Sequence, residues 1–382
     1  MTSGELGYVV VSACIELLEK LVAIPSVNPV YGGPGEADVE AFVRSWLSEK
    51  GIDFICQEVL SGRRNVVAHI GSVEKPSVLV EAHMDTVGVD GWALGDPYNL
   101  QCREGKWYGR GSCDTKASLA TFLLLAALCK ERASELNRSL VFAATADEEA
   151  AQLGAYKLAE LKNRFDIQGA LTGEPTRSAI VTKHKGACRY TIKALGKAAH
   201  GSTPQLGENA IYKIARLVEK LERLAELLSQ EDNREPIERG SLNVGRIFGG
   251  IGFNIVPDNC SIDIDRRLGV LEEMEEAREA IEAIVKTEMG ASLSTVLERP
   301  SLNTDNRNWL PQALAKSALE SGIDSGFGEV AFMTNGVAYA SAGIPTVVFG
   351  PGDINQAHKV DEYIEEGEME RALKILESFF LS

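Results

Sequence analysis

Histidine is scarce in this sequence, so any site that requires imidazole groups must draw on very few residues. The 382 residues include five histidines, which are His69, His83, His184, His200 and His358. Three common motifs are absent as well: the Gly-x-Ser-x-Gly elbow, the GxxxxGK[ST] phosphate loop and the HExxH helix. Chemistry based on any of these three motifs is therefore disfavoured.

Basic residues are also in deficit. Asp and Glu number 55 against 39 Lys and Arg, which gives a formal net charge of −16. A chain of this charge would be repelled by the phosphates of nucleic acid and by anionic lipid head groups. We therefore expect no nucleic-acid partner and no membrane partner.

Long apolar runs, basic leader residues and paired cysteines are missing too. The most apolar run, residues 119–129, is too short to cross a bilayer, and no Lys or Arg precedes the first apolar stretch as in a secretory signal. The seven cysteines are odd in number and contain no CxxC pair, which is typical of reduced thiols. These features predict a cytoplasmic protein.

The first and last parts of the chain alternate short apolar runs with helical patterns. Strands are predicted at 66–70, 77–82, 140–145, 170–172 and 345–349, and helices at 15–21, 39–47, 117–130, 153–161, 310–321 and 369–380. Such alternation is typical of an α/β fold. It predicts a mostly parallel sheet with helices on both faces, formed by residues 1–187 and 301–382.

The middle of the chain has a different order of elements. Strands at 190–194, 242–248, 260–264 and 293–297 combine with helices at 210–228 and 272–289 in the order β-α-β-β-α-β. This is the split βαβ, or ferredoxin-like, arrangement, which can close its own core. We therefore predict an inserted α+β domain at residues 188–300.

Acidic residues and histidines follow the predicted strands of the α/β domain. The residues in these positions are His83, Asp85, Glu148, Glu149, Glu174 and His358, and Asp114 lies in a turn before the helix at 117–130. Ligand sites in α/β sheets form at the carboxyl ends of strands. Any one of these residues alone could be a helix cap or a solvated turn residue, so the prediction of a site depends on the whole set. His69 and His184 are interpreted as structural.

Two imidazoles with several carboxylates and no thiolate suit Zn²⁺, Co²⁺ or Mn²⁺. The number of acids predicts two ions that share one carboxylate, a pair that can activate a water and polarise a carbonyl. The adjacent Glu148 and Glu149 can divide the work, one as a ligand and the other as a general base.

These motifs together resemble those of the M20 family of metallopeptidases and amidohydrolases, over nearly the whole chain. The matching segments are HMDTV (83–87), YGRGSCDTK (108–116), ATADEE (144–149), TGEPT (172–176), AHGSTPQLGENAI (199–211), VPDNCSIDIDRR (256–267) and GPGDINQAHKVDEY (350–363).

The resemblance implies two zinc-type ions, for which Co²⁺ can substitute. One ion would be held by His83, Asp114 and Glu174, and the other by Asp114, Glu149 and His358, so that Asp114 bridges them. Asp85 would orient His83, Glu148 would be the general base, and Glu362 would stand behind His358.

The resemblance also implies a homodimer, with the inserted domain as lid and dimerisation domain. His200 would reach the active site of the partner subunit and stabilise the oxyanion, and Asn254 and Arg267 would help to hold the substrate carboxylate or oxyanion.

Within the family, residues 329–334 and 350–358 are most similar to acetylornithine deacetylases. This implies a small-molecule N-acyl amino acid as substrate, namely N-acetyl-L-ornithine, cleaved to L-ornithine and acetate in arginine biosynthesis. A broader N-acyl-amino-acid deacylase, a succinyl-diaminopimelate desuccinylase, a dipeptidase and a non-catalytic metal-binding relative remain alternatives. Residues 333–336 depart from the family sequence and are predicted to line the substrate pocket.

Overall fold

The computed structural model describes residues 3–230 and 234–381, and these form two compact units. The first unit comprises the residues up to 182, 304–328 and those from 334 onward; the second comprises 183–303 and 329–333. Segment 329–333 was not predicted to belong to the second unit. It lies beside residue 183 because β14 (Phe327–Val330) pairs with β8 (Ile180–His184), and Lys183 forms an ion pair with Glu329 at 2.7 Å.

The main sheet has a parallel centre and antiparallel flanks. Its strands lie in the order β1 (Phe54–Leu60), β2 (Arg63–Ile70), β6 (Ser139–Thr145), β3 (Ser77–His83), β7 (Ile167–Thr172), β15 (Thr346–Val348), β8 and β13 (Leu302–Asn303). The four strands β6, β3, β7 and β15 run parallel, whereas β1, β2, β8 and β13 pair antiparallel.

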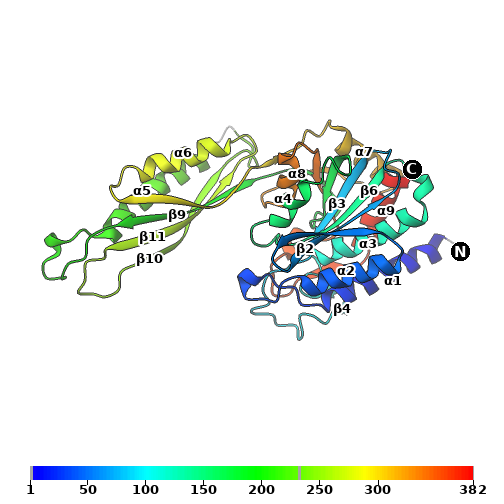
Figure 1. Ribbon diagram of the computed structural model, residues 1–382, viewed down its shortest axis with the longest axis horizontal. Coiled ribbons are helices and arrows are strands. Elements are labelled where there is room, and N and C mark those ends of the chain that lie inside the picture. The colour runs from blue at the N-terminus through cyan, green and yellow to red at the C-terminus, as the bar shows by residue number, and fades with distance from the viewer. Residues whose placement is uncertain (1–2, 231–233, 382) are drawn as a thin grey trace. The chain divides into compact units, whose positions relative to one another are not determined.

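Helices cover both faces of this sheet, because the side chains of its central strands are buried on both sides. In β3, Val78 and Val80 pack on one face while Leu79 packs on the other. The first face is covered by α1 (Ser3–Val22), α2 (Ala37–Glu49), α3 (Lys116–Glu131), α7 (Trp309–Glu320) and α9 (Glu368–Leu381). The second is covered by α4 (Leu153–Ala159) and α8 (Gly336–Ser341) (Figure 1). The predicted fold class is confirmed.

The second unit consists of β9 (Gly186–Leu195), α5 (Ala210–Ser229), β10 (Ser241–Gly249), β11 (Asn259–Leu268), α6 (Met274–Val285) and β12 (Ala291–Arg299). Its strands form an antiparallel sheet in the order β10-β11-β9-β12. Tyr190 and Ile192 of β9 are buried against Ile214 of α5 and Ile281 of α6, whereas Arg189 and Lys193, which point to the other face, are exposed. One face of the sheet therefore carries both helices, as in a ferredoxin-like fold (Figure 1).

Several short elements were not predicted from the sequence. A small sheet of β16 (Tyr363–Glu365), β5 (Lys106–Tyr108) and β4 (Gln101–Arg103) belongs to this group, as do the 3₁₀ helices η1 (Pro29–Tyr31), η2 (Ala133–Glu135), η3 (Pro204–Leu206) and η4 (Ile354–Gln356). Elements of three residues are too short to show a hydrophobic period. Within the described residues, no helix is both long enough and apolar enough to span a bilayer.

Candidate metal centre

Residues at or just after the ends of three parallel strands lie at one edge of the main sheet. In the register of the sheet, His83 at the end of β3 lies opposite Thr145 at the end of β6. Glu81 of β3 likewise lies opposite Thr172 at the end of β7. Since Glu148, Glu149 and Glu174 follow β6 and β7 directly, they lie at the same edge as His83.

His83, Asp114 and Glu174 come together at this edge. The Nε2 atom of His83 lies 3.1 Å from Oδ1 of Asp114 and 3.9 Å from Oε1 of Glu174. Asp114 and Glu174 are nearly inaccessible to solvent, as is His83. The structure thus brings together the three residues predicted to hold the first ion.

Asp114, Glu149 and His358 form a second group. The Nε2 atom of His358 lies 3.2 Å from Oε2 of Glu149 and 3.4 Å from Oδ2 of Asp114. One atom each from His83, Asp114 and Glu149 lies within 4.8 Å of the others, a spacing that a metal ion could bridge. The two oxygens of Asp114 therefore face two different imidazoles, which is the position a bridging ligand would take.

The charges and donor atoms of this cluster fit two divalent cations. Burial raises the pKa of Glu174, and it raises the pKa of Glu149 as well. Among the described residues, Oε1 of Glu149 is buried without a hydrogen-bond partner. Uncompensated buried carboxylates are costly unless cations neutralise them. Nitrogen and oxygen donors without sulfur are also the ligands that Zn²⁺, Co²⁺ and Mn²⁺ accept.

Protons occupy the imidazoles when no cation is bound. Hydrogen bonds to Asp114 and Glu149 raise the pKa of His358 to about 11. Burial by itself would lower the pKa of His83, but its hydrogen bonds to Asp114 and Asp85 outweigh burial and raise it. A cation bound to these nitrogens must therefore displace protons.

Asp85 supports the site through two different groups. Its backbone carbonyl oxygen lies 2.9 Å from Nδ1 of His83, whereas its Oδ1 atom is 3.6 Å away. The carboxylate accepts the backbone N–H groups of Glu148 and Glu149, both at 3.1 Å, and the side-chain amide of Asn28 at 2.7 Å. The hydrogen bond that orients His83 is thus made by the backbone of Asp85, and the carboxylate holds the loop of the two glutamates.

Glu148 has the environment of a general base. Burial is the largest cause that raises its pKa to about 8, and nearby carboxylates add to it while His83 opposes it. Its Oε1 atom accepts a hydrogen bond of 3.1 Å from Nε2 of Gln152. A pKa near neutrality suits a group that takes up and returns a proton.

The loop of Glu148 and Glu149 has a strained backbone that neighbouring side chains hold in place. Asp147 and Gln152 adopt left-handed conformations with φ of 72° and 60°, which are costly for residues other than glycine. Arg63 pairs with Oδ1 of Asp147 at 2.9 Å. No motif or periodicity in the sequence indicates Asn28, Arg63 or Gln152, whose roles are visible only in the tertiary contacts.

The remaining predicted residues belong to the second unit. His200 is exposed, and its Nδ1 atom lies 2.7 Å from the hydroxyl of Ser202. Asn254 adjoins it, since the backbone N–H of Gly201 donates to the carbonyl of Asn254 at 2.7 Å. Arg267 pairs with Asp265 at 2.8 Å near the far end of β11. At about 3.3 Å per residue, the length of this strand separates Arg267 from Asn254 within the unit.

Of residues 333–336, which were predicted to line the substrate pocket, Met333 is partly exposed. Thr334 and Asn335 are fully buried. The amide of Asn335 donates to the Glu81 carboxylate at 2.9 Å. Asn335 thus satisfies part of the buried Glu81 carboxylate.

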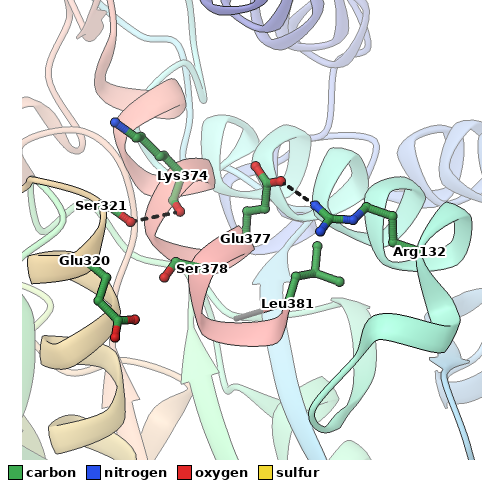
Figure 2. Close-up of a pocket in the computed structure, with 7 residues that line it drawn as sticks. All are labelled: Arg132, Glu320, Ser321, Lys374, Glu377, Ser378 and Leu381. Atoms are coloured by element: carbon green, nitrogen blue, oxygen red, sulfur yellow. Dashed lines mark hydrogen bonds and ion pairs between the residues drawn. The ribbon is translucent and has the colours of Figure 1, made fainter. Parts of the chain in front are cut away.

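A cavity lies away from the metal centre. It has a volume of about 430 Å³ and is bordered by the ends of α3, α7 and α9, where Arg132 forms an ion pair with Glu377 at 2.9 Å (Figure 2). Its lining is mostly charged and polar and includes Glu320, Lys374 and Ser378. It contains none of the residues of the metal centre.

Comparison with known proteins identifies relatives over most of the chain. The sequence model of peptidase family M20/M25/M40 matches residues 79–382. An acetylornithine deacetylase of Proteus mirabilis is 31% identical over 96% of this chain and 97% of its own length. A probable succinyl-diaminopimelate desuccinylase of Staphylococcus aureus is 27% identical over 92% of this chain and 93% of its own.

Solved structures share the fold. A dinuclear metal-binding peptidase of the M20 family from Bacillus subtilis superimposes with a TM-score of 0.71 at 17% identity, over 97% of both chains. At this identity the similarity concerns the architecture of the chain and not its substrate.

Proposed function

The chain belongs to peptidase family M20/M25/M40 and is a metal-dependent hydrolase of amide bonds; on this premise we propose that it is a dinuclear deacetylase of N-acetyl-L-ornithine, which releases L-ornithine and acetate in arginine biosynthesis. The observation that carries the dinuclear site is the Asp114 carboxylate, whose two oxygens lie 3.1 Å from His83 and 3.4 Å from His358. His83, Asp114 and Glu174 would hold one ion, and Asp114, Glu149 and His358 the other.

In this proposal the protein residues position the reactants and move protons. Divalent cations, when bound, supply charge that acidifies a water and polarises an acyl carbonyl. Glu148 accepts a proton from the attacking water and returns it to the leaving amine nitrogen. Its pKa of about 8 in the cation-free protein supports this role, and bound cations would lower that pKa because they favour the carboxylate. Gln152 orients the carboxylate of Glu148 through the hydrogen bond at 3.1 Å.

The choice of substrate rests on similarity to relatives. Acetylornithine deacetylases are found among them at about the same level of identity as a probable succinyl-diaminopimelate desuccinylase. A desuccinylase, a broader N-acyl-amino-acid deacylase and a dipeptidase therefore remain the competing members of the same reaction class.

A substrate panel tests the proposal directly. The purified protein is loaded with Zn²⁺ or Co²⁺ and assayed with N-acetyl-L-ornithine, other N-acetyl amino acids, N-succinyl-L,L-diaminopimelate and dipeptides. We expect the highest kcat/KM with N-acetyl-L-ornithine. A higher value with another compound would replace the substrate, and a metal-loaded protein inactive on every compound would indicate a non-catalytic relative.

We also propose that the protein works as a homodimer in which His200 stabilises the oxyanion in the partner's active site, with Asn254 and Arg267 as further substrate contacts. The exposure of His200 on the second unit leaves its imidazole available for this role. Mixing inactive Glu148→Gln with inactive His200→Ala protein tests it. Hybrid dimers would contain one complete site and regain activity, whereas no recovery after exchange of subunits would contradict a contribution from the partner.

We further propose a cytoplasmic location. The seven cysteines are all unpaired, including the exposed Cys56 and Cys102, and free thiols on the surface suit a reducing compartment. Fractionation of cells that express the protein, with immunodetection, tests this location.

A further inference from the structure

Glu362 is fully buried, and its carboxylate binds the loop that carries Asp114. Its Oε1 atom accepts the backbone N–H groups of Cys113 and Asp114, both at 2.8 Å. Its Oε2 atom accepts the N–H of Gly111 at 2.9 Å and the guanidinium of Arg110 at 2.7 Å. All these partners are donors, so the position requires a group that only accepts hydrogen bonds, which is an ionised carboxylate.

Arg110 extends this contact to the segment of His358. Its Nη1 atom binds Glu362, and its Nη2 atom donates at 3.0 Å to the carbonyl oxygen of Lys359, the residue after His358. The guanidinium is itself buried and lies 5.5 Å from the ring of Trp92. One ion pair thus binds the backbone beside both Asp114 and His358.

The two ends of this connection lie far apart in the sequence and meet through the small sheet. Tyr363 of β16 pairs with Tyr108 of β5, which places Glu362 directly beside the loop after β5. The backbone N–H of Gly109 donates to the carbonyl of Glu362 at 3.2 Å. His358, by contrast, lies in a left-handed conformation with φ of 61° and has a side chain that is 57% exposed, so its position depends on such neighbours.

We propose that the Arg110–Glu362 pair is a positioning device that sets the spacing between Asp114 and His358. The inference rests on the proposed function, in which these two residues bind the same ion. His83 and Glu174 differ in this respect, because His83 is the last residue of β3 and Glu174 follows β7, so the register of the main sheet fixes their positions. Disruption of the pair should therefore weaken the ion held by Asp114, Glu149 and His358 more than the ion held by His83, Asp114 and Glu174.

Glu362→Gln is the primary variant. It replaces one oxygen by an NH₂ group, which then faces two donors and can accept from neither. Loss of residues that support metal ligands typically weakens metal binding about 10- to 100-fold. We expect a loss of this size for one ion and a smaller loss for the other. Glu366→Gln is the matched control, since Glu366 is exposed a short distance along the chain.

The experiment is a metal titration of cation-free protein, with Co²⁺ followed by visible absorption and Zn²⁺ followed by calorimetry. Wild type and Glu366→Gln should bind two ions with the same affinities, and Glu362→Gln should show the selective loss. The unfolding temperature of each cation-free protein is recorded as a measure of the fold. With both ions saturating, KM should be unchanged and kcat reduced in Glu362→Gln.

Arg110→Lys is the second variant and keeps the inference testable if Glu362→Gln does not fold. Lysine can still pair with Glu362, but it lacks the planar guanidinium that lets Arg110 also donate to the carbonyl oxygen of Lys359. The selective loss of affinity for one ion should therefore recur. Wild-type affinities in both variants would overturn the positioning role, as would equal weakening of both ions. A wild type that binds fewer than two ions would instead overturn the proposed dinuclear function.

Discussion

Glu148→Gln is the sharpest test of the chemistry, because it removes the proposed base and leaves the ligand set in place. Glutamine has the shape of glutamate, and its carbonyl oxygen can still accept the hydrogen bond of 3.1 Å from Gln152. It cannot take up a proton. Positioned acid–base groups contribute about 10²- to 10⁴-fold to rate, which corresponds to about 3–5 kcal/mol of activation free energy. We expect kcat/KM to fall by that factor.

The metal content should distinguish this variant from damage to the site. Glu148 is not among the proposed metal ligands, so both ions should remain bound in Glu148→Gln. Glu149→Gln is the matched comparison. It changes the neighbouring residue in the same way, but it should lose one ion because Glu149 lies 3.2 Å from His358.

The assay combines steady-state kinetics with N-acetyl-L-ornithine and metal analysis by mass spectrometry. A Glu148→Gln enzyme whose kcat/KM stays within a factor of ten of wild type would refute the assignment of the base. Loss of an ion from Glu148→Gln, with both retained in Glu149→Gln, would refute the division of roles between the two glutamates.

Three further predictions follow from packing and protonation. In Gly173→Ala the new Cβ would lie 2.4 Å from the ring of Phe122, so overpacking should lower the free energy of unfolding by about 1–3 kcal/mol in urea and displace Glu174. Burial lowers the pKa of His184 to about 4 in the folded protein, below its unfolded value of about 6.5. The free energy of unfolding should therefore fall by about 3 kcal/mol as the pH drops from 6.5 to 4. Urea titrations at pH 7 and pH 4 should show that His184→Gln lacks this part of the loss. Because His358 has a pKa of about 11 without cations, Zn²⁺ binding at pH 7 should release protons. Calorimetry in buffers of different ionisation enthalpy measures how many protons are released. A binding reaction that releases none would contradict the protonated imidazole.

The order of residues along the chain was sufficient to predict the fold class and to place several candidate ligands at one edge of the sheet. Apolar runs such as 77–82 and 140–145 have the length and composition of strands buried on both faces, and charged or histidine residues follow each of them within two positions. A parallel sheet gathers the ends of such strands at one edge. His83, Glu149 and Glu174 could therefore be assigned to one site without coordinates.

The sequence was less informative where a role depends on contacts between distant segments. Asp85 was predicted to orient the His83 ring; it does contact that ring, at 2.9 Å through its backbone carbonyl, while its carboxylate also accepts from the backbone of Glu148 and Glu149. Asn335 likewise has a partner that its place in the sequence does not indicate, the buried carboxylate of Glu81. A side chain's partner is decided by which loops meet, and neither periodicity nor motif spacing contains that information.

The scarce histidines illustrate the same division. The sequence by itself limited the imidazoles of the site to five candidates and placed His83 and His358 after strands. Only the tertiary structure decided that His83 faces one oxygen of Asp114 at 3.1 Å and His358 faces the other at 3.4 Å. The structure also decided that Arg110 and Glu362 bind the backbone next to His358 and at Asp114. The reason is physical: residue types and periods determine local structure, whereas the distance between two ligands depends on long-range packing of segments that the sequence keeps apart.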